Sequence, residues 1–161
     1  MRYDGLMTAV TPAVSQRRPP RTRRLGYTIA VVVNGAILFV VHNLLAWGVP
    51  EWLTVDFNEV LPILTTSILV TIMVNTVLLF YDEPWFTTAC ELVTLGLSMA
   101  VAVATYRVFP FDFSAYAWDW DVMVRWVIVL TIAAMSIALV VNAVKLVTII
   151  AESLPGVGST T

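Results

Sequence analysis

The sequence predicts an all-α integral membrane protein built as a four-helix bundle, and three observations lead to this fold class. Hydrophobic residues make up 59% of the 161 positions, only 12% are charged, and the mean hydropathy is +0.85. Soluble domains are about 45–50% apolar and about 25% charged. Four long runs contain at most one charged residue each. Because a chain this small cannot bury so much apolar surface within itself, lipid must cover it.

The four apolar runs predict membrane-spanning helices at about 25–48, 60–81, 85–107 and 122–150. About 20 apolar residues cross a hydrocarbon core of about 30 Å, and each run reaches that length. The runs must be helical because lipid offers no hydrogen-bond partners for open backbone groups. The transmembrane domain therefore covers 25–151, between a basic arm at 1–24 and a short tail at 152–161.

The arm determines the expected orientation. Its five clustered arginines are Arg17, Arg18, Arg21, Arg23 and Arg24. Arginines beside the first helix favour the cytoplasmic side, so four helices put both termini in the cytoplasm. Prolines and like charges oppose compact structure, which predicts a disordered arm able to bind anionic lipid headgroups.

The connections between the helices carry distinct signals. Asp82 and Pro84 predict a tight cytoplasmic turn in which Asp82 caps the third helix and Pro84 occupies its first turn. The connections at 48–59 and 108–124 are then external. Segment 109–120 is dense in aromatic residues and predicts an amphipathic loop along the outer membrane surface, with its rings toward lipid and its carboxylates toward water.

Each predicted helix contributes at least one polar side chain to a band in the inner half of the membrane. The band comprises Asn34, Asn75, Glu91, Asn142 and Lys145. Ionisable residues inside a membrane are costly and are therefore candidates for function. Two interpretations remain open: Glu91 pairs with Lys145 while the asparagines hydrogen-bond across helices, or the band forms an ion relay or a polar ligand site.

A second set of candidates lies toward the outer side, namely His42, Asn43, Arg107 and Arg125. His42 is expected to be a satisfied core or interfacial histidine, with proton handling as the alternative. Arg107 and Arg125 fall on the external side, against the orientation rule, but the five arginines of the arm outnumber them. The two outer arginines are expected to pair with Asp119, Asp121 or lipid phosphate, or else to face an anion or a partner.

Several chemistries lack the residues that they need. One histidine cannot supply both axial ligands of a membrane haem, and Cys90 has no second cysteine with which to form a disulfide within the chain. No Glu-x-x-His pair is present for a di-metal bundle, and the arm lacks the interleaved aromatics of a nucleic-acid binder. We therefore expect no enzyme, cofactor, metal or nucleic-acid partner.

The absence of catalytic motifs and the short loops predict a non-catalytic accessory, scaffold or assembly subunit of a larger membrane complex. The alternative is a small oligomeric transporter or channel with Glu91 and Lys145 in a polar pathway. Arginine outnumbers lysine, and alanine and valine are abundant. This bias fits a GC-rich bacterial genome, so the expected location is a bacterial plasma membrane.

Overall fold

The computed structural model describes residues 20–48 and 50–153, and within them the chain forms four helices. These are α1 (Pro20–Trp47), α2 (Phe57–Leu78), α3 (Pro84–Val108) and α4 (Trp120–Ser153). All four are long and apolar enough to cross a membrane. The predicted all-helical fold with four helices long and apolar enough to span a membrane is confirmed.

The first helix begins earlier than expected. Residues 20–24, assigned from the sequence to a disordered arm, form the first turn of α1, while 1–19 lie outside the described residues. Proline suits a first helical position because its fixed φ is already helical and its missing N–H would be unpaired there anyway. A basic segment therefore starts this helix, and one of its arginines has a fixed partner, as described below.

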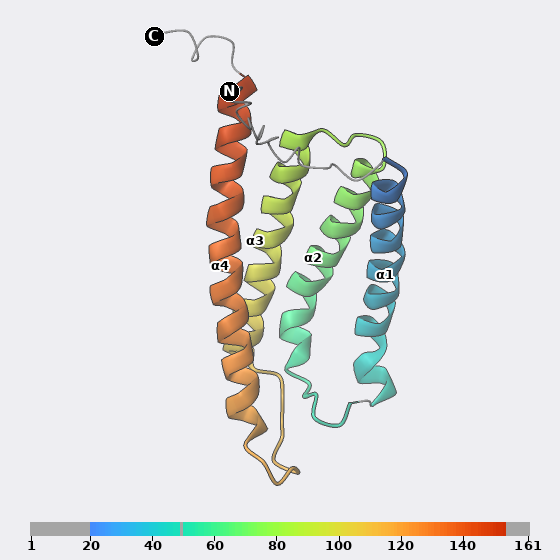
Figure 1. Cartoon of the computed structure of the whole chain (residues 1–161). Helices are drawn as coiled ribbons and strands as arrows, with labels where there is room; N and C mark the ends of the chain where they lie inside the picture. The colour runs from blue at the N-terminus through green and yellow to red at the C-terminus, as the bar shows by residue number, and fades with distance from the viewer. Residues whose placement is uncertain (1–19, 49, 154–161) are drawn as a thin grey trace, which may run out of the picture.

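The helices form an open bundle in which each packs against its neighbour in the sequence. The contacts join α1 to α2, α2 to α3, and α3 to α4, with none between α1 and α4 in the described chain. Figure 1 shows the four helices side by side and antiparallel, with α4 reaching past α3 at both ends. The start of α1, the α2–α3 turn and the end of α4 lie together at one end, called here the turn end. The opposite end, with the two longer connections, is called the loop end.

Little of this apolar chain is buried within itself. The buried apolar side chains of the described residues are Phe57, Val60, Ile68, Leu78 and Cys90. The most apolar stretch of α4 contains no buried residue. Burying a Val, Leu or Ile side chain contributes about 1.5–3 kcal/mol, so an exposed apolar surface of this size is typical of a chain that lipid or partner helices cover.

The two connections at the loop end are hydrogen-bonded to each other. The Thr54 N–H donates to the Pro110 carbonyl at 3.0 Å, and the Asp112 N–H donates to the Trp52 carbonyl at 2.8 Å. Phe109 makes this possible because it follows α3 with a left-handed φ of 45°, which turns the chain sharply. Non-glycine residues rarely adopt this conformation, so the surrounding contacts must hold it. The two loops thus form one structural unit.

Candidate functional site

A hollow of about 420 Å³ lies on one face of the helical row, near the midpoints of the helices. Its polar lining residues are Asn34 from α1, Ser67 and Thr71 from α2, and Ser98 from α3. Met135 of α4 also lines it, among apolar side chains of α2 and α3. Because α1 and α4 both reach the hollow without touching each other, the row must curve around it.

Part of the polar lining has no hydrogen-bond partner within the described chain. The Asn34 side-chain amide donates to the Ala30 carbonyl at 2.8 Å, and the Thr71 hydroxyl donates to the Ser67 carbonyl at 2.8 Å. The Asn34 side-chain oxygen and the hydroxyls of Ser67 and Ser98 have no such contact among the described residues. Polar groups at membrane depth are stabilised by hydrogen bonds from neighbouring helices, so this hollow offers unused donors and acceptors.

A stripe of polar residues leads from the turn end to the hollow. On both α1 and α3, three polar residues are separated by four and then by seven positions, and this spacing keeps them on one face of the helix. They are Arg23, Tyr27 and Asn34 on α1, and Thr87, Glu91 and Ser98 on α3. Glu91 is exposed; at the two ends of these rows, Tyr27 and Thr87 both contact Asp82, and Asn34 and Ser98 both line the hollow. The two helices therefore present their polar faces to the same side.

The remaining helices extend this stripe. Asn75 follows Thr71 by four residues on α2, and Asn142 follows Met135 by seven on α4, so both fall on the faces that line the hollow. The whole set is called here the polar furrow: Arg23, Tyr27, Asn34, Ser67, Thr71, Asn75, Thr87, Glu91, Ser98 and Asn142.

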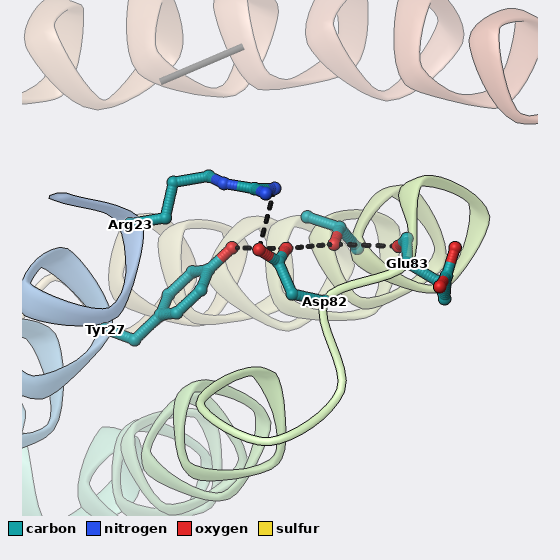
Figure 2. A network of polar contacts seen from close by, with 5 residues as sticks. Arg23, Tyr27, Asp82 and Glu83 are labelled. Carbon is teal, nitrogen blue, oxygen red and sulfur yellow. Dashed lines mark hydrogen bonds and ion pairs between the residues drawn. The ribbon is translucent and has the colours of Figure 1, made fainter. Parts of the chain in front are cut away.

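At the turn end, the furrow begins with a network around Asp82 (Figure 2). Arg23 Nη1 lies 2.7 Å from Asp82 Oδ2, while the Tyr27 hydroxyl donates to Oδ1 at 3.0 Å. The Thr87 hydroxyl lies 3.3 Å from the same Oδ1 and 3.0 Å from the Glu83 carbonyl. Figure 2 shows Arg23 and Tyr27 reaching from α1 toward the α2–α3 turn.

This network fixes α1 to the turn beyond α2, although α1 and α3 have no helix-to-helix packing. The Arg23 and Asp82 side chains are 31% and 24% exposed, so the ion pair is partly shielded from solvent. Arg23 Nε is buried without a hydrogen-bond partner. Breaking such a pair leaves the other charge uncompensated, which destabilises far more than the loss of an exposed surface pair.

The expected cap at this end is wrong. Asp82 does not cap α3: the residue before the helix is Glu83, without a side-chain capping bond, and Pro84 is the first helical residue as expected. The carboxylate of Asp82 is instead engaged by the charged and hydroxyl groups of the network. The partners of Asp82 were missed because Arg23 was assigned to the arm. A signal was present, since Arg23 and Tyr27 are four residues apart on one helical face and the acidic α2–α3 turn lies at the same end of the bundle.

The predicted polar band is only partly connected. Glu91 and Lys145 are both exposed, and the single ion pair of the described residues is that of Arg23 with Asp82. The expected Glu91–Lys145 pair is therefore not formed. Asn34 and Asn75 do not bridge helices, because each donates to the carbonyl four residues earlier in its own helix, at 2.8 Å. In an apolar helix that carbonyl is the nearest acceptor.

The outer-side candidates do not converge on one site. His42 Nδ1 donates to the Leu38 carbonyl at 3.0 Å, which leaves Nε2 to accept from the Thr65 hydroxyl of α2 at 3.4 Å. His42 is exposed, and its role stays a prediction. Asn43 donates to the Phe39 carbonyl of its own helix at 2.7 Å.

For the two outer arginines, one of the expected pairings, with Asp119 or Asp121, is wrong. The Arg125 guanidinium carbon lies 3.9 Å from the Phe109 ring centroid, and neither Arg125 nor Arg107 forms an ion pair with an aspartate of the described chain. The left-handed turn at Phe109 brings its ring over Arg125, which favours a cation–π contact there. In the described residues, no three His, Cys, Asp or Glu side chains gather closely enough to hold a metal ion.

No protein-family model, characterised protein sequence or solved structure matches this chain. Function is therefore inferred from its residues and their geometry.

Proposed function

We propose that this chain is a non-catalytic accessory or assembly subunit of a membrane complex, and that its polar furrow receives a transmembrane segment of a partner protein. The observation that carries the proposal is Glu91, an exposed carboxylate without an ion-pair partner in the described part of a membrane-spanning helix. Placing a charged side chain in the bilayer interior costs at least about 2.5 kcal/mol. A partner helix with a complementary donor or cation removes that cost.

The depth of Glu91 supports this proposal. It lies seven residues after the first residue of α3, which corresponds to about 10 Å along the helix. Lys145 is less decisive because α4 has 34 residues and is about 50 Å long, well beyond a core of about 30 Å. The flexible Lys145 side chain can therefore reach an interface by itself.

The polar furrow extends over only one half of the expected membrane thickness. This favours docking of a partner helix rather than a pathway across the membrane. From Ser98 to the loop end, α3 carries no charged side chain before Arg107, and from Ser67 in the same direction α2 carries none before Glu59. In that half, α2 and α3 therefore offer a permeating ion no charged group before their ends, although His42 of α1 and Thr65 of α2 are polar. A partner helix needs only local hydrogen bonds and small neighbouring side chains.

The proposed setting is the plasma membrane of a bacterium, with both termini in the cytoplasm and the loop end outside. The five arginines ahead of or within the first turn of α1 support this orientation. The arm is proposed to contact anionic lipid headgroups on the cytoplasmic side.

The proposal is tested by purifying the tagged full-length protein from its own host in mild detergent and identifying co-purifying proteins by mass spectrometry. A stoichiometric membrane protein is expected with the wild type. Its recovery should fall at least about fivefold with Ser98→Leu, which fills the hollow, or with Glu91→Gln. Glu152→Gln is the matched control, because Glu152 is exposed at the end of α4 and lies outside the furrow.

A second candidate, a small oligomeric transporter, is supported by the fact that one hollow is lined by all four helices. It predicts a purified homo-oligomer without other proteins and a lower solute flux in liposomes containing Glu91→Gln. That outcome would overturn the accessory-subunit proposal.

A further inference from the structure

A second hollow, also of about 420 Å³, lies at the loop end, far from the polar furrow along the helices. Five aromatic rings and one aliphatic side chain line it: Trp52, Phe111, Phe113, Tyr116, Trp120 and Val124. Trp52 comes from the α1–α2 connection, the next three rings from the α3–α4 connection, and the last two residues from the first turns of α4. Small-molecule sites typically have volumes of about 300–1,000 Å³.

The rings of this aromatic hollow are held by one another and by the paired loops. Trp52 stacks on Phe113 at 5.8 Å between ring centroids and lies 5.6 Å from Phe111. Phe113 also meets Tyr116 at 6.2 Å. Both Phe111 and Phe113 flank Asp112, whose N–H is fixed to the Trp52 carbonyl. The hollow is therefore built before any ligand arrives, which reduces the entropy lost on binding.

Along the sequence, the residues next to the lining of the aromatic hollow carry more negative than positive charge. Carboxylates neighbour its lining residues in the sequence: Glu51 precedes Trp52, Asp112 lies between two lining phenylalanines, and Asp119 and Asp121 flank Trp120. The nearest arginine, Arg125, has its guanidinium over the Phe109 ring, outside the lining. Such a field attracts cations and repels anions.

We propose that the aromatic hollow is a binding site for an organic cation with an apolar body, such as a quaternary ammonium compound. Aromatic faces attract a cation through their quadrupole, and a quaternary ammonium has no N–H groups that would require hydrogen-bond acceptors in the lining. The surrounding carboxylates add long-range attraction. The site does not depend on the furrow or on a partner protein.

Other small ligands fit this site less well. An anion meets the negative field, and a sugar would need several polar groups where five of the six lining side chains are Phe, Trp or Val. A neutral hydrocarbon fills the volume but gains nothing from the ring faces or the carboxylates. Preference for the cation over a neutral ligand of similar shape is thus the signature of the site.

The test uses isothermal titration of the full-length protein in nanodiscs of phosphatidylglycerol and phosphatidylethanolamine with benzyltriethylammonium. Benzyl alcohol and benzenesulfonate are the neutral and anionic comparison ligands. The cation should bind at least about tenfold more tightly than either. Equal affinity for benzyl alcohol, preference for the sulfonate, or no binding of the cation would each overturn the proposal.

Two variants separate ring faces from mere hydrophobicity. Phe113→Leu retains an apolar side chain but removes one ring, and it should weaken cation binding about fivefold while leaving benzyl alcohol unchanged. Trp118→Leu is the matched control, because Trp118 is 75% exposed in the same loop and does not line the hollow. If Phe113→Leu fails to fold, the preference of the wild-type protein for the cation over benzyl alcohol and benzenesulfonate still tests the proposal.

A quaternary ammonium group occurs both in soluble organic cations and in the headgroup of phosphatidylcholine. The lipid composition of the nanodisc distinguishes these two sources. If a lipid headgroup is the natural occupant, adding phosphatidylcholine should raise the apparent Kd for benzyltriethylammonium at least about fivefold by competition. If the occupant is a soluble cation, the Kd should not change. Either result requires that cation binding has first been observed.

Discussion

The two ends of this helical row are closed by different kinds of interaction. At the turn end, Asp82 collects one guanidinium and two hydroxyls from α1 and α3. At the loop end, stacked rings and two backbone hydrogen bonds join the connections, and the one arginine in contact with the rings stacks on Phe109. The turn end therefore adds an ion pair to ring contacts of its own among Tyr81, Trp85 and Phe86, whereas the described residues of the loop end have stacked rings and no ion pair.

This difference has consequences for how each end responds to its surroundings. Charge pairs weaken when salt screens them, whereas apolar contacts do not depend on ionic strength in this way. The middle of the row has neither kind of closure, and its polar furrow faces outward with unused hydrogen-bonding groups. Helix packing also buries Ser67 and Ile68 in the middle of the row, and the hollow beside them is where we propose that a partner docks.

The largest effect is expected from Asp82→Ala, which removes the common acceptor of the turn-end network. We expect a loss of about 2–3 kcal/mol in the free energy of unfolding in detergent, because Arg23 loses its partner while part of its guanidinium group stays buried. Glu83→Ala is the control, since its exposed side chain makes no capping bond. The double variant Arg23→Ala, Asp82→Ala should lose less than the sum of the single losses; strict additivity would show that the pair does not act as a unit.

A smaller effect is expected from Trp52→Ala at the loop end. The half-exposed ring packs on Phe111 and Phe113, so its removal should cost about 1.5 kcal/mol. Raising NaCl to about 0.5 M should shrink the Asp82→Ala effect and leave the Trp52→Ala effect unchanged. Thermal unfolding curves at the two salt concentrations measure this, and equal salt sensitivity of both variants would remove the distinction between the ends.

The smallest effect concerns the pH response of the loop end. The Ser114 backbone N–H donates to Asp112 Oδ1 at 2.9 Å and, with the Ser114 hydroxyl, holds the pKa of Asp112 below its ordinary value of 3.8. Folding therefore favours the ionised form of Asp112. Its contribution to the stability of the folded state is complete above the ordinary pKa of 3.8 and is lost as the pH falls through the lower pKa of the folded state. Tryptophan fluorescence should report a loosening of the loop below about pH 4 that is absent in Asp112→Asn. An identical acid transition in the variant would assign the change to other carboxyl groups.

The sequence predicts the helices well because length and charge content alone identify a membrane span. The predicted starts at 60, 85 and 122 lie within three residues of Phe57, Pro84 and Trp120. Only the start of α1 differs by more, because the Pro-Arg segment was assigned to the arm and the contact of Arg23 with Asp82 was not considered. Membership of the furrow was partly predicted as well, because depth follows from position along each helix.

The rotation of each helix about its own axis could not be predicted. In a soluble helix the apolar stripe identifies the buried face, whereas here the lipid-facing and the protein-facing sides are both apolar. Depth alone therefore left open whether Glu91 faces Lys145, and the described residues show no ion pair between them. The aromatic hollow was missed for another reason: Trp52 and Phe113 lie in different connections, and the pairing of two loops leaves no local sequence pattern.

The most direct test of the central claim, that the furrow receives a partner helix, is photo-crosslinking in living cells. A photoreactive phenylalanine analogue is placed at Met135, which lines the hollow, or at Ile137, which lies two residues further along α4 and is 68% exposed away from that lining. The account predicts a discrete crosslink to one membrane protein from Met135, and none to that protein from Ile137. Crosslinks of equal yield from both positions, or only lipid adducts from Met135, would contradict it.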